Sequence, residues 1–168
     1  MRKERIDLAG ARQRIELPIG EVIIFSDGNG ICEILAAAEN PQRKEWLLAD
    51  DKPDKYTEKA AKQLREYFSG KRKLFDVKLS LSGTDFQLKV YKAMLDIPFG
   101  EVKSYGEIAK AVGSPKAARA VGGACHSNPV PFIVPCHRVL GSDNSLTGFG
   151  LGLDAKKLLL KLEGISWH

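Results

Sequence analysis

The pattern of apolar residues changes near Ser80, and this change limits the fold of the chain more than any other feature of the sequence. Before it, residues 14–39 read RIELPIGEVIIFSDGNGICEILAAAE, with β-branched runs that are interrupted at residues 18–20 and 27–30. The second interruption, Asp-Gly-Asn-Gly, has the composition of a tight hairpin turn. This segment therefore predicts strands that are joined by hairpins.

One helix and one further strand are predicted before the change in pattern. Asp54 is a suitable N-cap for a helix over residues 55–68 (KYTEKAAKQLREYF), and Gly70 is a suitable end. The helix has one apolar face at helical spacing, which consists of Tyr56, Ala60, Leu64, Tyr67 and Phe68. Residues 74–82 (LFDVKLSLS) alternate between apolar and polar positions and predict a strand.

The second half of the chain is dominated by helix start and stop signals. Residues 84–87 (TDFQ) and 104–107 (SYGE) are capping boxes, in which a Ser or Thr is followed three residues later by Glu or Gln. The first predicted helix ends before Pro98, and the second ends at Gly113. The apolar side of the first helix consists of Phe86, Val90, Tyr91, Met94 and Leu95.

Two more helices are predicted near the end of the chain. Ser114 and Pro115 are suitable as the N-cap and first residue of a helix that continues through KAARAVGGAC, and Asp154 is a suitable N-cap for AKKLLLKLE. We therefore expect an α/β (α+β) protein. Its N-terminal domain, residues 1–80, contains a β-sheet and a helix, and its C-terminal domain, residues 81–168, is mostly helical.

The helices expected on either side of Gly113 are joined by a short turn, which makes them a helix-turn-helix candidate. An ordinary α-hairpin is the alternative. The second of these helices carries small residues around Lys116 and Arg119, and such a surface can approach another helix or a DNA groove closely. Arg119 can enter a groove or a base stack, although a salt bridge is the simpler alternative. The net charge of +5 permits a polyanionic partner without requiring one.

The sequence predicts no membrane segment and no signal peptide. No apolar run approaches the roughly 18 residues that span a bilayer. Residues 1–17 (MRKERIDLAGARQRIEL) are charged throughout and lack the apolar core of a signal peptide. We expect a cytoplasmic protein, in which Cys32, Cys125 and Cys136 are by default small buried hydrophobes.

Cys136 has the most unusual surroundings of the three cysteines. It lies in residues 128–141 (NPVPFIVPCHRVLG), where three prolines disfavour helix and predict an extended segment. With residues 125–126 it forms the pattern C-H-x9-C-H, which offers four zinc ligands. The spacing is atypical for structural zinc, and adjacent side chains of an extended chain point to opposite faces. A Cys-His hydrolase is a second interpretation, with His126 as a candidate base.

A third interpretation is a thiolate that carries out a single displacement. An ordinary thiol, with a pKa of about 8.5, is only slightly ionised at neutral pH. A nearby imidazole with a carboxylate behind it can raise the ionised fraction through a bridging water. Attack on an alkyl carbon produces a thioether, which does not hydrolyse under such conditions. A protein of this kind would therefore act once per molecule.

The residues around Cys136 resemble those of a known family. Residues 128–139 (NPVPFIVPCHRV), with SYGEIAKAVGSPKAARAVGGA before them and LTGFGLGLDAKKLLLKLEG after them, closely resemble the O6-alkylguanine-DNA alkyltransferases. The resemblance extends from Gly83 to Ile165. It implies a winged-helix/helix-turn-helix alkyltransferase domain that follows a variable ribonuclease-H-like β-sheet domain. Some members bind zinc in that first domain, but Cys32 and the absence of histidine before residue 126 lead us to expect no metal and no cofactor here.

The resemblance implies roles for five residues. Cys136 is similar to the alkyl acceptor, His137 to a base that acts through a water, and Glu163 to the carboxylate that orients this base. Tyr105 occupies the position of a tyrosine that helps to rotate the nucleotide and donates a proton toward the guanine ring. Arg119 matches the arginine that fills the gap left by the flipped base.

Further expected contacts are less specific. Asn128 matches a hinge between the recognition helix and the active-site segment, and Val139 lies where the family uses a backbone carbonyl to bind the guanine amine. The expected DNA contacts, made from the minor groove, are Ser114, Lys116 and Ser142.

The sequence departs from the family in the wall of the expected pocket, around Gly150. Phe149 stands where many members have a tyrosine, and Leu151 stands where glycine is common, so we expect Leu151 to narrow the pocket. The implied function is DNA repair, with double-stranded DNA containing O6-alkylguanine as the partner of a monomeric protein. Cooperative binding to DNA and the size of alkyl group accepted are left open. Relatives that bind DNA without transfer lack the cysteine, so Cys136 argues against that class.

Overall fold

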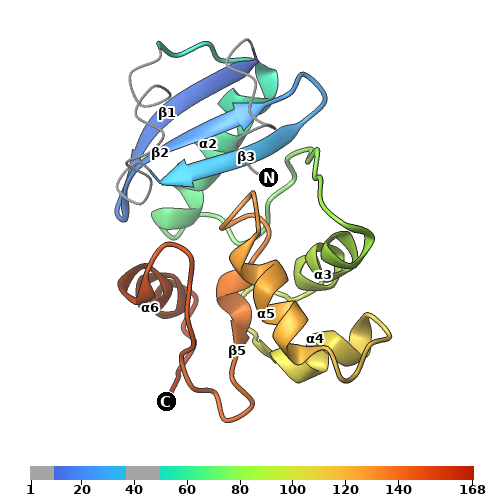
Figure 1. The fold of residues 1–168 in the computed structure, drawn as a ribbon. Helices are drawn as coiled ribbons and strands as arrows, with labels where there is room; N and C mark the ends of the chain where they lie inside the picture. Colours follow the sequence, from blue (N-terminus) through green and yellow to red (C-terminus); the bar gives the residue numbers. More distant parts are fainter. Residues whose placement is uncertain (1–9, 37–49) are drawn as a thin grey trace. The chain divides into compact units, whose positions relative to one another are not determined.

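The computed structural model of the protein describes residues 10–36 and 50–168 (Figure 1). The chain falls into two compact units, Met1–Leu81 and Ser82–His168. Within the described ranges, no helix is both long enough and apolar enough to cross a bilayer.

The first unit is built on a three-stranded antiparallel sheet. Strands β1 (Ala11–Leu17), β2 (Gly20–Ser26) and β3 (Ile31–Ala36) are neighbours in that order, so the strands predicted from the β-branched runs are confirmed. Gly28 in the second turn has a φ of 88°, a conformation that glycine adopts without strain. The central strand β2 is buried from Val22 to Ser26, which places it in the core of the unit.

Helix α2 (Lys55–Phe68) covers one face of this sheet (Figure 1) and contacts all three strands. The predicted start is confirmed: the side chain of Asp54 accepts hydrogen bonds from the backbone N–H groups of Tyr56 and Thr57, at 3.0 and 2.8 Å. These bonds satisfy two of the N–H groups that a helix leaves without partners at its start. The apolar face faces the core, with Ala60, Leu64, Tyr67 and Phe68 buried.

The strand predicted over residues 74–82 is wrong. The segment makes only an isolated bridge to Ile31, through bonds from Ile31 N to Lys78 O and from Ser80 N to Ile31 O, both 2.8 Å. The alternating pattern does not lead to a full strand because a side chain of α2 occupies one of the backbone N–H groups that a neighbouring strand would need. The N–H of Asp76 donates to Gln63 Oε1 at 3.0 Å instead of to a neighbouring strand.

The second unit contains three helices that pack on one another and a fourth near the cysteine. Helices α3 (Asp85–Leu95) and α4 (Tyr105–Ala111) begin at the two predicted capping boxes, both of which are confirmed. Helix α5 (Ala118–His126) packs on both of them, and α6 (Leu153–Leu162) contacts the short turn that carries Cys136. Short strands β4 (Lys103–Ser104) and β5 (Val139–Leu140) pair in parallel, so the unit is helical with a small sheet. The predicted mixed α/β (α+β) class is confirmed.

Three details of the predicted helices are wrong. Helix α5 begins at Ala118, because Ser114 lies in a separate turn in which its carbonyl accepts from Ala117 N at 2.9 Å. The N-cap of α6 is Gly152, with a φ of 92°, so Asp154 lies within the first turn, where a carboxylate still interacts favourably with the helix dipole. Leu95, predicted on the apolar side of α3, is 42% exposed.

Candidate active site

The proline-rich segment before Cys136 is a tight buried loop, and not the extended strand expected from its sequence. The side chain of Asn128 holds the loop from within: Oδ1 accepts from Val130 N at 3.0 Å, and Nδ2 donates to Val134 O at 2.8 Å. Val134 N also donates to Val130 O at 3.0 Å, and Phe132 has a φ of 73°. The prolines therefore restrict the backbone of a loop that closes on Asn128.

Cys136 begins a single 3-10 turn, Cys136–Arg138, that follows this loop. The turn is fixed by bonds from Cys136 N to Val134 O at 2.8 Å and from Arg138 N to Pro135 O at 3.0 Å. A 3-10 helix has three residues per turn, so its successive side chains point about a third of a turn apart. The cysteine and the histidine therefore face different surroundings, although the extended geometry from which this was expected is wrong.

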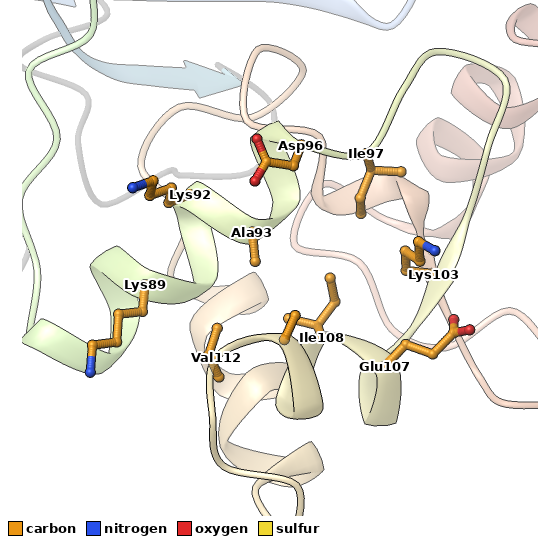
Figure 2. Close-up of a pocket in the computed structure, with 10 residues that line it drawn as sticks. Lys89, Lys92, Ala93, Asp96, Ile97, Lys103, Glu107, Ile108 and Val112 are labelled. Atoms are coloured by element: carbon orange, nitrogen blue, oxygen red, sulfur yellow. The ribbon is translucent and has the colours of Figure 1, made fainter.

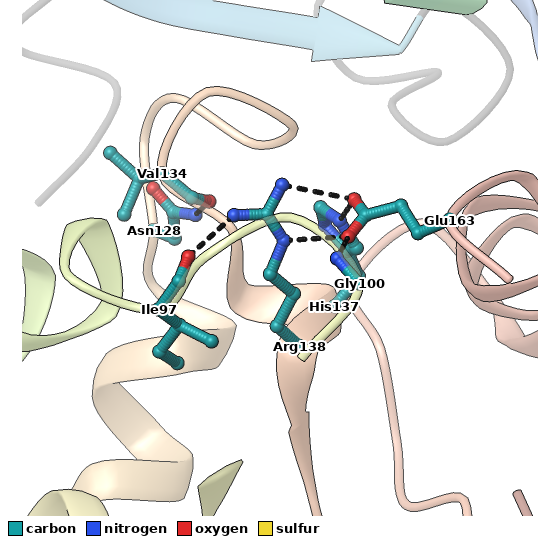
Figure 3. A network of polar contacts seen from close by, with 7 residues as sticks. All are labelled: Ile97, Gly100, Asn128, Val134, His137, Arg138 and Glu163. Carbon is teal, nitrogen blue, oxygen red and sulfur yellow. Dashed lines mark hydrogen bonds and ion pairs between the residues drawn. The ribbon is translucent and has the colours of Figure 1, made fainter. Parts of the chain in front are cut away.

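Glu163 is the centre of a buried polar network behind the cysteine (Figure 3). Its Oε2 lies 2.7 Å from His137 Nε2, and Arg138 donates to both of its oxygens, from Nε at 2.8 Å and from Nη2 at 3.1 Å. The backbone N–H of Gly100 donates to Oε1 at 3.0 Å. Arg138 also donates from Nη1 to Ile97 O at 2.6 Å. The network thus joins three segments that are distant in the sequence.

The geometry of this network fixes the state of His137. Burial lowers the pKa of the imidazole, while the bond to Glu163 acts in the opposite direction. The neutral ring donates its Nε2–H to the carboxylate, which leaves Nδ1 as its basic nitrogen. Arg138 was not predicted from the sequence, and its guanidinium forms a two-point ion pair with the same carboxylate.

A cavity of about 430 Å³ in the second unit is lined by Cys136. Five of the residues that the resemblance singled out line it, namely Tyr105, Arg119, Cys136, Phe149 and Gly150. Cys125 and Thr147 line it as well. The start of α4, the exposed side of α5 and the segment before α6 therefore meet around the cavity that Cys136 lines.

The remaining residues that the resemblance singled out lie outside this wall, whereas His126, the candidate base of a hydrolase, lines it. Two of them, His137 and Glu163, are buried in the network described above, and Asn128 and Val139 are buried beside the turn. Leu151, which was expected to narrow the pocket, is half-buried and lies outside its wall. Of the three expected DNA contacts, Ser114 is half-buried, and Lys116 and Ser142 are exposed.

Tyr105 is held at the edge of the cavity by Thr147, which the sequence analysis did not identify. The two hydroxyl oxygens lie 2.5 Å apart. Burial raises the pKa of Tyr105, although this hydrogen bond acts against the rise. The phenol is therefore un-ionised at neutral pH and has a proton to donate.

A second cavity, of about 570 Å³, lies between α3 and α4 (Figure 2). Its rim carries Lys89, Lys92 and Lys103, and its floor includes Ile97 and Ile108. The lining of this cavity contains no cysteine or histidine, so it offers neither a thiol nor an imidazole. The smaller cavity is therefore the candidate active site.

The described residues do not form a metal site. No group of three or more His, Cys, Asp or Glu side chains in these ranges is placed to hold a metal ion. The C-H-x9-C-H interpretation also fails on geometry. Cys125, His126 and Cys136 line the same cavity, but His137 is fully buried and bonded through Nε2 to Glu163.

Acidification is expected to destabilise the protein through His137. The pKa of His137 in the folded protein lies below the ordinary value of about 6.5, so folding favours the neutral ring. The contribution of His137 to stability is therefore complete above about pH 6.5 and is lost as the pH falls below that value. The expected slope is up to about 1.4 kcal/mol per pH unit in the free energy of unfolding, measured with urea between pH 7 and 5. His137→Asn should remove this slope, and His126→Gln, at an exposed position, should retain it. Equal slopes in the wild type and His137→Asn would contradict the prediction.

Comparison with known proteins places both units in one family. Residues 85–165 match the family described as "6-O-methylguanine DNA methyltransferase, DNA binding domain", and residues 12–81 match its "ribonuclease-like domain". A methylated-DNA–protein-cysteine methyltransferase of Methanosarcina acetivorans is 45% identical over 149 residues, which cover 89% of this chain and 95% of that protein. The constitutive methylated-DNA–protein-cysteine methyltransferase of Bacillus subtilis is 44% identical over 155 residues, which cover 90% of this chain and 94% of that protein.

Solved structures agree with this result. The crystal structure of Mycobacterium tuberculosis OGT in complex with DNA has a TM-score of 0.81 and 43% sequence identity, and the match covers 91% of this chain and 92% of that one. A crystal structure of the M. tuberculosis O6-methylguanine methyltransferase gives a TM-score of 0.80 at 44% identity, with the same coverage. The chain therefore belongs to the 6-O-methylguanine DNA methyltransferase family.

Proposed function

We propose that this protein repairs double-stranded DNA by transferring the alkyl group of O6-alkylguanine to the sulfur of Cys136, once per molecule. The observation that carries the proposal is the cavity with Cys136 in its wall, between a helix-turn-helix and a buried His–Glu pair. The relatives named as methylated-DNA–protein-cysteine methyltransferases support the reaction type, and the M. tuberculosis complex supports DNA as the partner.

The alkylated base must leave the duplex before it can reach this cavity, because O6 is covered inside a base pair. Arg119 is exposed on α5 and also lines the cavity, so it is placed to fill the gap in the stack. Lys116 and Ser142 are exposed and able to reach phosphates. Ser114 lies in the turn between α4 and α5, where its hydroxyl is a candidate contact even though it does not cap a helix.

The chemical step is a displacement at carbon. Nδ1 of His137 takes the thiol proton through a water, and the sulfur then forms a bond to the alkyl carbon while the bond from carbon to O6 breaks. The released electron pair stays on the guanine, which accepts a proton from the Tyr105 hydroxyl. The proton on His137 then passes through solvent to the phenolate of Tyr105 and restores its neutral form. The net result is the transfer of the thiol proton to guanine.

The buried network holds the parts of this reaction in place. Glu163 fixes the ring of His137, and Asn128 fixes the loop that precedes the nucleophile. Such positioning favours the linear approach of sulfur, carbon and oxygen that a displacement requires. Phe149 gives the cavity an aromatic wall without a hydroxyl, and the carbonyl of Val139 is the proposed acceptor for the guanine amine.

Intact mass spectrometry after mixing with duplex DNA that contains O6-methylguanine tests the proposal. We expect each molecule to gain the mass of one CH2 group, mapped by peptide analysis to Cys136, and then to stop. Cys136→Ala should gain nothing, and Cys125→Ala, which changes another thiol of the same cavity, should still react. Unmodified wild-type protein would contradict the proposal, and repeated turnover would indicate a hydrolase instead.

The monomeric state, the cytoplasmic location and any cooperative binding stay predictions. Light scattering of the free protein measures its oligomeric state, and titration of DNA of increasing length measures cooperative binding. The salt dependence of DNA binding should be steep, since phosphate contacts release counterions.

A further inference from the structure

Lys156 is a buried charge on the apolar face of α6. The side chain is 1% exposed and shares this face with Leu159 and Leu160, which are fully buried. Burial of an ammonium group is costly unless an anion or several acceptors compensate it. The proposed chemistry gives this lysine no role, so its burial requires a separate explanation.

The contacts of Lys156 do not neutralise its charge. Nζ donates to the carbonyl oxygen of Val139 at 3.0 Å and lies 6.0 Å from the centre of the Phe149 ring. An ammonium group has three donors, and the hydrogen bonds of the described residues give it this one neutral acceptor. No carboxylate in residues 10–36 and 50–168 lies within ion-pair distance of it.

The acceptor of Lys156 belongs to the segment of the nucleophile. Val139 follows the 3-10 turn that begins at Cys136, so the bond fixes the ammonium next to this turn. Burial lowers the pKa of Lys156, and the interactions that oppose this are with Cys136 first and Cys125 second. The positive charge of Lys156 therefore acts on the thiols of the cavity.

The other buried or half-buried titratable groups around Cys136 are neutral or already paired. Arg138 is matched by Glu163 in a two-point ion pair, and burial keeps His137 neutral. Burial raises the pKa of Tyr105 and raises that of Cys125 to about 12, so neither becomes an anion at neutral pH. Arg119 and His126 also line the cavity but are exposed to solvent. Among the buried groups described around Cys136, Lys156 is thus the cation without a matching anion, beside a thiol that must become an anion to react.

We propose that Lys156 is the counter-charge of the Cys136 thiolate. Its ammonium group, held by the Val139 carbonyl, stabilises the anionic sulfur after His137 has taken the proton. Lys156 is a positioning residue, since it acts on the nucleophile and does not contact DNA. This inference rests on the proposed function for its biological meaning, but the ionisation of Cys136 can be measured without DNA.

The test is the rate at which iodoacetamide labels Cys136 between pH 5 and 10, followed by peptide mass spectrometry. We expect the wild-type rate to have its midpoint below the value of about 8.5 for an ordinary thiol. Lys156→Met should move the midpoint up by about one pH unit, which slows labelling at pH 7 about tenfold, while the rates converge at high pH. Cys32 and Cys125, whose pKa values burial raises to about 12, serve as slow internal references.

Two further variants separate charge from structure. Lys157→Met removes the same charge from an exposed position of the same helix and should leave the midpoint unchanged. Lys156→Gln retains a donor for the Val139 carbonyl but no charge, and it should shift the midpoint as Lys156→Met does. A purely structural role of Lys156 would instead slow labelling equally at every pH.

Two results would overturn the inference. One is an equal midpoint in the wild type and in both Lys156 variants. The other is a wild-type midpoint at or above that of an ordinary thiol, which decides the question even where the variants do not fold. Normal labelling of Cys136 without any methyl transfer from DNA would count against the proposed function and leave the role of Lys156 intact.

Discussion

Glu163→Ala should lower the free energy of unfolding by about 3–5 kcal/mol and stop alkyl transfer. The reason is that the carboxylate compensates several buried groups at once. Its removal leaves the charge of Arg138 buried without an anion and the N–H of Gly100 without its acceptor. It also frees the ring of His137, which then no longer presents Nδ1 to the thiol.

Urea unfolding and single-turnover transfer to O6-methylguanine DNA measure the two effects. The matched control is Glu101→Ala, which removes a carboxylate from an exposed position of the same unit and should stay within about 0.5 kcal/mol of the wild type. Glu163→Gln retains the shape but not the charge, and it should fall between the two in stability. A Glu163→Ala protein as stable as the Glu101→Ala control would show that the network does not hold the unit together.

Asn128→Ala is expected to lower the free energy of unfolding by about 2–6 kcal/mol, the other large effect on stability. The side chain satisfies one donor and one acceptor of a fully buried loop, Val130 N and Val134 O, and each buried group left without a partner costs about 1–3 kcal/mol. The loop leads directly into the turn of Cys136. Transfer by the folded fraction should therefore also slow, because the sulfur is no longer held for a linear approach.

Thermal or urea unfolding together with the rate of methyl transfer at saturating DNA checks this result. Asn29→Ala, an exposed asparagine in the turn between β2 and β3, is the control and should change neither quantity. If Asn128→Ala lowers stability but leaves the transfer rate of the folded protein intact, the loop is held by Asn128 for folding alone.

Local signals in the sequence predicted most of the helix starts. The capping residues Asp54, Thr84 and Ser104 act within three residues of chain, so their hydrogen bonds follow from the sequence alone. The strand predicted over residues 74–82 was wrong because a strand needs a neighbouring strand to bond with. The backbone N–H of Asp76 instead donates to the side chain of Gln63 on a helix. Alternation of apolar and polar residues does not specify which group will accept the backbone hydrogen bonds of the segment.

The site was predictable only in part, for a similar reason. The motif around Cys136 identified the residues of the cavity wall, but Arg138 and Lys156 were missed. The partners of Arg138 lie 25 and 41 residues away in the sequence, and only the folded chain brings them together. A signal for Lys156 was present, since a lysine interrupts the apolar face of the last helix, but its meaning depends on the turn against which that helix packs.

The 3-10 turn at Cys136–Arg138 has a consequence for how such a protein can evolve. Cys136 lines the cavity, while His137 and Arg138 both bond to Glu163. The loss or gain of one residue here would therefore rotate each side chain into the place of the next. The cavity wall near Phe149 comes from another stretch of chain, before α6. Selection can therefore alter the lesions that the protein accepts through that stretch, while the length of the nucleophile's turn stays fixed.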